Sequence, residues 1–287
     1  MSVKSIIVPL DGSDASFRVL DTALIISRRF DAKITGIHVR IKADDLPFEL
    51  DYVSAGLKQT VIEKADRKST DESRIIRDQF TKFCGKYNIE VGDSITDADV
   101  GAVWQEESGN VAEVLIRYGR LCDVIATARP SRTKGSLLRS PVGENTEALL
   151  MRAGRPVLMV PPGWPARKVE RAAVAWNESL EVSRALAMTM PWLGEMDEVD
   201  IIVARKRERS VPALAEYLSL HGVKSKARFL PPGIKPVGQA ILDCCEENGI
   251  EMLVVGGFSH TRSRQLVFGG VTRFLLANSN IITVMVH

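Results

Sequence analysis

The chain repeats one order of apolar runs and loops twice, and this internal repeat constrains its fold more than any other feature. The matching landmarks are Asp11 with Asn177 at an offset of 166, Ala128 with Gly256 at 128, and Gly143 with Gly269 at 126. The offset of 126 persists to the last apolar run of each half, where Met159 matches Met285. A spacing kept over this length indicates two copies of one structural unit.

Within each half, short apolar runs alternate with stretches of helical periodicity. Residues 5–10 and 33–39 are two such runs, and they flank a helix that ends near residue 29 and begins with Ser13 or Asp14 as its cap. Strand, helix, strand in this order predicts a parallel βαβ unit. The further strands that we predict are 100–104, 123–126, 156–160, 172–176, 199–203, 224–230, 252–255 and 281–286. We therefore predict an α/β protein of two tandem Rossmann-like domains, each with a five-stranded parallel sheet flanked by helices.

A proline-rich segment at 161–165 separates the two halves, because it fits neither a helix nor a central strand. We predict an N-terminal domain over residues 1–161, a linker over 162–169 and a C-terminal domain over 170–287. Trp164 in this segment is expected to pack at the joint between the domains. A long charged helix over 55–87 has no equally long counterpart in the second half.

Composition excludes several functional classes. The net charge of +2 is too small to indicate nucleic acid or an acidic membrane surface as a partner. No apolar run approaches the length of about 20 residues that spans a membrane, and no signal peptide precedes the first strand, so we expect a cytoplasmic protein. The four cysteines form no C-x-x-C pair and no cluster with histidine, which predicts reduced, buried thiols and no metal site.

The stretch from residue 252 to 275 has the chemistry of a phosphate site. A buried strand ends in Gly256 and Gly257, a loop rich in Ser, His and Arg follows, and Gly269 and Gly270 open a helix. Glycines let the backbone turn sharply and leave a ligand uncovered. A glycine loop and a helix N-terminus together direct unpaired N–H groups at one point, where an anion binds.

The spacing of this stretch resembles the G-x2-G-x9-G-[S/T] signature of the universal stress protein family, with Ser259 and Gly270 as departures. The resemblance covers essentially the whole chain. It implies HUP-type domains with strand order 3-2-1-4-5 and a glycine loop that holds the phosphates of ATP, with Mg²⁺. It also implies that strands 156–160 and 281–286 pair within the chain, and it is compatible with a homodimer.

In family members that bind ATP, the acidic residue after the first strand and the end of the second strand hold the nucleoside. The second half keeps most of the phosphate end but has Asn177 in place of the acid and Glu178 in place of glycine. The structural alternative is that its glycines serve only turns and tight helix packing. The nucleotide-binding candidates here are Ala175, Trp176, Asn177, Val203, Gly256, Gly257, Ser259, His260, Arg262, Gly269, Gly270, Val271 and Thr272.

The first half shows the opposite pattern, an intact nucleoside end and an eroded phosphate end. Pro130 removes a donor, and Glu144 places a carboxylate where a phosphate would need the helix N–H groups. The candidates for this weaker second site are Pro9, Leu10, Asp11, Val39, Ala128, Ser131 and Gly143. His38, near the end of the second strand, is expected to be a hydrogen-bonded structural residue.

Three functions fit these patterns. The first is a nucleotide-binding regulator of the stress response that takes ATP or another adenine nucleotide in its C-terminal domain. The second is a protein-interaction module of the same fold that binds no nucleotide. The third is an enzyme, and it is the weakest, because the chain has no P-loop, nucleophile elbow or metal ligand set and could support at most slow ATP hydrolysis.

Overall fold

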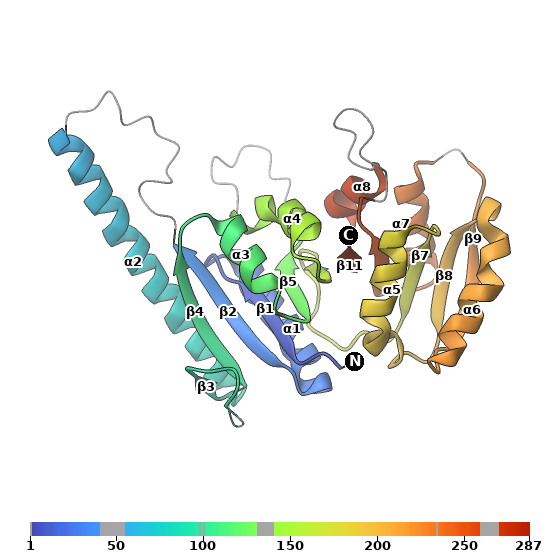
Figure 1. The fold of residues 1–287 in the computed structure, drawn as a ribbon, viewed down its shortest axis with the longest axis horizontal. Coiled ribbons are helices and arrows are strands. Elements are labelled where there is room, and N and C mark those ends of the chain that lie inside the picture. Colours follow the sequence, from blue (N-terminus) through green and yellow to red (C-terminus); the bar gives the residue numbers. More distant parts are fainter. Residues whose placement is uncertain are drawn as a thin grey trace.

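The computed structural model describes residues 2–40, 55–97, 99, 101–130, 141–233, 235–258 and 270–287. In this part of the chain, eleven strands form one sheet in the order β3-β4-β2-β1-β5-β6-β11-β10-β7-β8-β9 (Figure 1). The strands of the first half are β1 (Ser5–Pro9), β2 (Lys33–Arg40), β3 (Val91–Gly92), β4 (Ala102–Ser108), β5 (Val124–Ala128) and β6 (Val157–Val160). Those of the second half are β7 (Ala172–Trp176), β8 (Val199–Ala204), β9 (Ser225–Leu230), β10 (Met252–Gly256) and β11 (Ile282–Val286).

Both halves have the predicted strand order. The five main strands of the first half lie as β4-β2-β1-β5-β6, and those of the second as β9-β8-β7-β10-β11. Numbered within each half, both orders are 3-2-1-4-5, and every pair inside a half is parallel. The order reverses beside the first strand of each half, so a ligand crevice is expected between the carboxyl ends of its first and fourth strands.

Helices cover both faces of the sheet. The helices are α1 (Asp14–Phe30), α2 (Ala55–Lys86), α3 (Val111–Gly119), α4 (Pro141–Arg152), α5 (Leu180–Leu193), α6 (Val211–Leu220), α7 (Val237–Glu247) and α8 (Gly270–Asn278), with a 3₁₀ helix η3 (Arg205–Ser210) after β8. One apolar core contains buried residues of α1, α2, α5 and α6, and the other contains those of α3, α4, α7 and α8. The layers are therefore helix, sheet, helix. None of the described helices is long and apolar enough to cross a membrane.

The two halves meet through their last strands. β6 and β11 are antiparallel, with Leu158 opposite Val284 in the centre of the pair. These are the two strands, 156–160 and 281–286, that the resemblance places side by side. Arg129 follows β5 and donates a hydrogen bond to the carbonyl of Ala277 near the end of α8, and burial lowers the pKa of its guanidinium. Backbone pairing and a half-buried cation thus join the halves.

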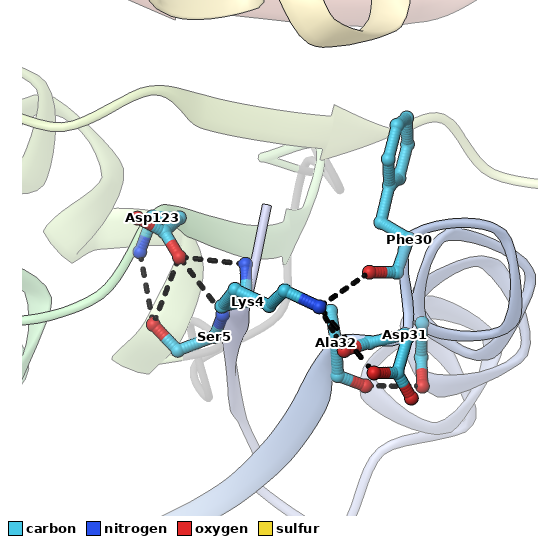
Figure 2. Close-up of polar contacts among 7 residues, drawn as sticks. Lys4, Ser5, Phe30, Asp31, Ala32 and Asp123 are labelled. Atoms are coloured by element: carbon cyan, nitrogen blue, oxygen red, sulfur yellow. Dashed lines mark hydrogen bonds and ion pairs between the residues drawn. The ribbon is translucent and has the colours of Figure 1, made fainter. Parts of the chain in front are cut away.

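An acidic residue before the fourth strand fixes the start of the first strand. Asp123 Oδ2 accepts hydrogen bonds from the backbone N–H groups of Lys4, at 2.7 Å, and Ser5, at 2.9 Å (Figure 2). The Lys4 ammonium in turn donates to the carbonyls of Phe30 and Asp31 at the end of α1. This cluster anchors β1 to β5 and to α1 at the edge of the sheet opposite the expected crevice.

The second half repeats this arrangement with different residues. Glu251 Oε2 accepts from the backbone N–H groups of Glu170, at 2.7 Å, and Arg171, at 3.4 Å. Glu251 matches Asp123 at the offset of 128, and Glu170 matches Lys4 at 166, the same offsets that relate the strand ends. The sequence repeat is therefore also a repeat of specific hydrogen bonds.

The third strand of the first half differs from the sequence prediction of 100–104. β4 begins at Ala102 and continues to Ser108 through the charged residues Glu106 and Glu107. Both carboxylates have partners, because Glu106 pairs with Arg40 at 2.8 Å and Glu107 with Arg117 at 3.0 Å. Charges that would end a half-buried strand are neutralised here by neighbouring elements, so the strand extends past them.

The cysteines are free thiols, as predicted. Cys84, Cys122 and Cys245 are buried and Cys244 is half-buried. Burial raises the pKa of Cys84 to about 11 and those of Cys122 and Cys245 to about 12, so these thiols stay protonated and unreactive near neutral pH. Among the described residues, no group of three or more His, Cys, Asp or Glu side chains could hold a metal ion.

Candidate functional site

A pocket of about 180 Å³ lies at the expected crevice of the second half. It opens where β7 and β10 end and where α8 begins. Its lining residues are Ala175, Trp176, Asn177, Ile202, Ala204, Lys206, Arg207, Leu230, Val237, Ile241, Val255, Gly256, Gly270, Val271 and Thr272. Four strand ends, two helix starts and η3 thus converge on one concave site, as expected for ligand sites of doubly wound sheets.

The pocket brings together seven of the candidates predicted for this half. They are Ala175, Trp176, Asn177, Gly256, Gly270, Val271 and Thr272. Four other candidates, Ser259, His260, Arg262 and Gly269, lie outside the described residues, as does Ser131 of the first half. The remaining two, Val203 and Gly257, are described but do not line the pocket.

Val203 lies on the other face of the sheet, where it belongs to the core under α5 and α6. Strand residues alternate between faces, so its neighbours Ile202 and Ala204 line the pocket instead. The register explains the shift. Pro9 pairs with Ile37, and its counterpart Ala175 pairs with Ile202; two residues further along these second strands are Val39 and Ala204. Ala204, not Val203, is thus the counterpart of Val39.

The turn after β7 is held by Asn177 in the way that Asp11 holds the turn after β1. Asn177 Oδ1 accepts from the Ser179 N–H at 3.1 Å, and Asp11 Oδ1 accepts from the Ser13 N–H at 3.0 Å. Both serines then cap the following helix through their hydroxyl oxygens. The exchange of acid for amide preserves this turn, because the turn uses one carbonyl-type oxygen, and removes a negative charge from the pocket.

The residue between the aspartate or asparagine and the serine has left-handed backbone geometry in both halves. Gly12 has φ of 80° and Glu178 has φ of 61°. A Cβ at Gly12 would lie 3.1 Å from the Ile76 side chain of α2, a tight contact that adds to the preference of this φ for glycine. Glu178 extends away from such contacts and pairs with Arg207 of η3 at 3.4 Å. The strained glutamate thus connects the turn to a basic side chain of the pocket.

Gly256 is a glycine because the backbone of α5 lies directly against it. A Cβ at this position would lie 2.5 Å from the Val182 nitrogen and 2.9 Å from the carbonyl carbon of Glu181. This close approach brings the first turn of α5 up to the end of β10. Tight helix packing, the alternative to ligand binding considered above, thus requires glycine at position 256 independently of any ligand.

The next two N–H groups of this loop have partners within the protein. The Gly257 N–H donates to the Val286 carbonyl at 2.7 Å, and the Phe258 N–H donates to Thr272 Oγ1 at 3.0 Å. Phe258 is buried and has φ of 55°, a geometry that costs a residue with a Cβ about 1–2 kcal/mol. Thr272 thus ties the strained loop start to the first turn of α8.

Sequence reasoning missed the contribution of η3 and of the strand ends beside it. Lys206 and Arg207 line the pocket, and Ser210 Oγ accepts a hydrogen bond from Trp176 Nε1 at 3.0 Å. The available signal was the run Arg-Lys-Arg immediately after the second strand of the unit, where nucleotide-binding folds recognise the ribose. Apolar residues near the ends of β9 and α7 complete the wall: Leu230, Val237 and Ile241.

In the first half, the predicted residues have structural partners. Pro9 ends β1, and the Leu10 N–H donates to the Ile37 carbonyl at 2.8 Å. The Leu10 carbonyl lies 2.8 Å from His38 Nδ1, which confirms His38 as a hydrogen-bonded structural histidine. Val39 packs against the core of α3 and α4, and Ala128 ends β5.

Gly143 does not open its helix, because α4 begins two residues earlier, at Pro141. Proline is favoured in the first turn of a helix, where its missing N–H costs no hydrogen bond. Gly143 therefore lies inside the first described turn of α4, whereas the described part of α8 begins at Gly270.

Comparison with known proteins agrees with this architecture. The universal stress protein family matches residues 2–161, more than half of the chain. The chain belongs to the universal stress protein family.

Solved structures extend the likeness over both halves. A universal stress protein from Archaeoglobus fulgidus DSM 4304 matches with a TM-score of 0.67 and 16% identity, over 98% of this chain and 97% of that one. A functionally unknown protein from Pseudomonas aeruginosa PAO1 matches with a TM-score of 0.59 and 13% identity, over 99% and 92% of the two chains. A putative universal stress protein from Pseudomonas aeruginosa UCBPP-PA14 has a TM-score of 0.54 and 13% identity, over 99% and 93%. These structures share the tandem fold; no curated protein matches the chain.

Proposed function

We propose that this protein is a cytoplasmic regulator of the stress response that binds ATP or another adenine nucleotide in its second half. The observation that carries the proposal is the pocket of about 180 Å³ between the ends of β7 and β10 and the start of α8. In this proposal the second half is a C-terminal domain of residues 170–287. The N-terminal domain, residues 1–161, keeps the fold but not the phosphate end of the site.

The chemistry of the walls fits the two ends of a nucleotide. Leu230, Ile241 and Val255 offer apolar contacts to a flat base, and the Asn177 side chain lies beside them as a polar group. At the other end, Gly270, Val271 and Thr272 of the first described turn of α8 line the pocket, and the N-terminal turn of a helix offers N–H groups to an anion. A base would lie toward β8 and β9, and the phosphates would lie toward α8.

The volume sets a limit on what the pocket encloses. Pockets for drug-sized ligands have volumes of about 300–1,000 Å³, so about 180 Å³ encloses only part of a nucleotide, such as its base, and not the whole of ATP. The triphosphate and its Mg²⁺ would extend from the pocket along the start of α8. The pocket residues that the structure describes include no His, Asp or Glu that could act as a general base, which fits a ligand-controlled regulator better than rapid hydrolysis.

One observation favours the second function, an interaction module that binds no nucleotide. The N–H groups of Gly257 and Phe258 already donate to Val286 and Thr272. A phosphate would therefore depend on the later part of the loop and on α8 alone. The decisive measurement is direct, because the two functions differ in whether the protein holds a nucleotide.

The experiment is native mass spectrometry of the full chain purified without added nucleotide, followed by titration with Mg-ATP. We expect one adenine nucleotide per chain. Gly270→Glu should abolish binding, because it introduces at α8 the carboxylate that Glu144 provides at the matching position of the first half. The matched control is Asp11→Asn, which introduces the residue of the second half into the first and should leave the stoichiometry at one.

Other outcomes separate the alternatives. Two nucleotides per chain would show that the first half is also active. No adduct at millimolar ATP would refute nucleotide binding and favour the interaction module. If Gly270→Glu still bound one nucleotide and Asp11→Asn bound none, the nucleotide site would lie in the first half of the chain, which would contradict our proposal.

A further inference from the structure

The pocket of the second half has a second region suited to an anion, formed by η3 at the end of β8. This 3₁₀ helix has the sequence Arg-Lys-Arg-Glu-Arg-Ser, and its Lys206 and Arg207 line the pocket. The strands β8 and β10 are separated by β7 alone. Neighbouring strands are about 4.8 Å apart, so the end of β8 lies about 10 Å from the end of β10, where α8 offers its N–H groups.

The position of η3 is fixed by hydrogen bonds. Trp176 Nε1 donates to Ser210 Oγ at 3.0 Å, and that hydroxyl donates to the Arg207 carbonyl at 2.9 Å. The Arg207 guanidinium pairs with Glu178 at 3.4 Å, and its side chain is 33% exposed. Arg207 is thus held beside the pocket by the strained turn after β7. A preorganised cation loses less freedom when it binds an anion.

Lys206 differs from its neighbours in η3. Arg205 lies over the ring of Phe229 at 5.5 Å, and Arg207 has Glu178 as its partner. Lys206 is exposed and lines the pocket, and it forms no ion pair with any described residue. Its ammonium is therefore available to a ligand at the β8 end of the pocket.

One carboxylate that would oppose an anion here is replaced by an amide, and the remaining one, Glu178, is paired with Arg207. The first half has Asp11 after its first strand, and the second half has the neutral Asn177. In α/β dinucleotide sites, an acid at the end of the second strand accepts a hydrogen bond from the ribose 2′-hydroxyl, whereas a basic residue there accommodates a phosphate on that hydroxyl. After β8 the chain continues Arg205, Lys206, Arg207, with no acid before Glu208.

We propose that this pocket selects an adenine nucleotide that carries an additional phosphate on its ribose, at the 2′ or 3′ position, and that Lys206 and Arg207 bind that phosphate. The proposal rests on nucleotide binding in the second half and specifies its ligand class. The ribose phosphate would occupy the β8 end, and the 5′-phosphate would lie at the start of α8. Unmodified AMP would leave the η3 cations without an anionic partner from the ligand.

The test is isothermal titration calorimetry of the full chain with three nucleotides that share a 5′-phosphate: AMP, adenosine 2′,5′-bisphosphate and adenosine 3′,5′-bisphosphate. We expect one bisphosphate to bind about ten-fold or more tightly than AMP, the effect of one charge-assisted hydrogen bond. Lys206→Gln should remove most of this advantage, because it should lower the affinity for the bisphosphate far more than the affinity for AMP. Arg207→Gln should act in the same direction.

Arg209→Gln is the matched control, because Arg209 is an exposed cation of the same η3 but does not line the pocket. It should keep the preference for the bisphosphate. The inference is overturned if AMP binds as tightly as both bisphosphates, or if the preference survives in Lys206→Gln. A different result would be that neither Mg-ATP nor any of these three nucleotides binds. That result would refute the proposed function itself.

Discussion

Replacement of Gly256 by alanine should destabilise the protein even without a ligand. The new Cβ would lie 2.5 Å from the Val182 nitrogen, whereas ordinary contacts begin at about 3.4 Å, so atoms must separate by about 0.9 Å. The atoms in the way belong to the backbone of α5, whose first turn is held by the hydrogen bond from the Val182 N–H to Ser179 Oγ at 3.2 Å. The helix therefore cannot relieve the contact by a side-chain rotation.

The magnitude follows from two opposing effects. Overpacking a well-packed site costs about 1–3 kcal/mol, and we take about 3 because backbone must move. The unfolded chain loses conformational freedom when glycine becomes alanine, which returns about 0.4–1 kcal/mol. The free energy of unfolding should thus fall by about 2 kcal/mol, which corresponds to a melting temperature lower by roughly 4–8 °C for a chain of this size.

The assay is urea denaturation followed by circular dichroism, with thermal melts as a second measure. Gly270→Ala is the control, because a Cβ at Gly270 has no described atom within 4 Å. That variant should be as stable as the original or up to about 1 kcal/mol more stable. Equal stability of Gly256→Ala and the original protein would refute the packing argument. It would leave the ligand as the only reason for this glycine.

Three other changes test separate features. Glu178→Gly should raise the free energy of unfolding by about 0.5–1 kcal/mol in urea denaturation, because glycine adopts the positive φ without strain. The ion pair with Arg207 that is lost is partly exposed and contributes little to stability. Lower stability of the variant would show that this pair outweighs the strain. Phe80→Ala removes a fully buried ring that packs on Trp104 and should lower the free energy of unfolding by about 3–5 kcal/mol in the same assay. A decrease below about 1 kcal/mol would show that the core of the first half repacks around the missing ring. Burial raises the pKa of Cys122 from 9.0 to about 12. The free energy of unfolding should therefore be unaffected by this thiol below pH 9 and should fall by about 1.4 kcal/mol per pH unit as the pH rises from 9 toward 12. Cys122→Ala should reduce that slope in urea denaturation at pH 8 to 10.5, and an unchanged slope would contradict the assignment.

The sequence predicted the repeat and seven of the fifteen residues that line the pocket, and the family resemblance implied the strand order. Gly256, Asn177 and Gly270 could be predicted because turn residues at strand ends and helix starts have strong local preferences. The course of β4 could not, since Glu106 and Glu107 are neutralised by Arg40 and Arg117 from other elements. Local polarity argues against a strand there, and the tertiary pairs that permit it are invisible in the chain order.

The placement of residues around the pocket depends on tertiary structure in the same way. Whether Val203 or Ala204 faces the pocket depends on register, and a shift of one residue exchanges the two faces of a strand. The role of Lys206 in the pocket depends on the placement of η3, which the Trp176 hydrogen bond to Ser210 fixes. Contacts between residues about 34 positions apart carry no local signal in composition or periodicity.

The antiparallel junction of β6 and β11 has a further consequence, because both strands belong to one polypeptide. Two separate domains joined through the same strands would dissociate on dilution, but covalent linkage turns their association into an intramolecular step with a high effective concentration. The partnership therefore survives at any expression level. Each half is also free to diverge without loss of its partner: the residue after the fourth strand is Arg129 in one half, where it reaches Ala277, and Gly257 in the other. One half can in this way become a permanent support for the site of the other.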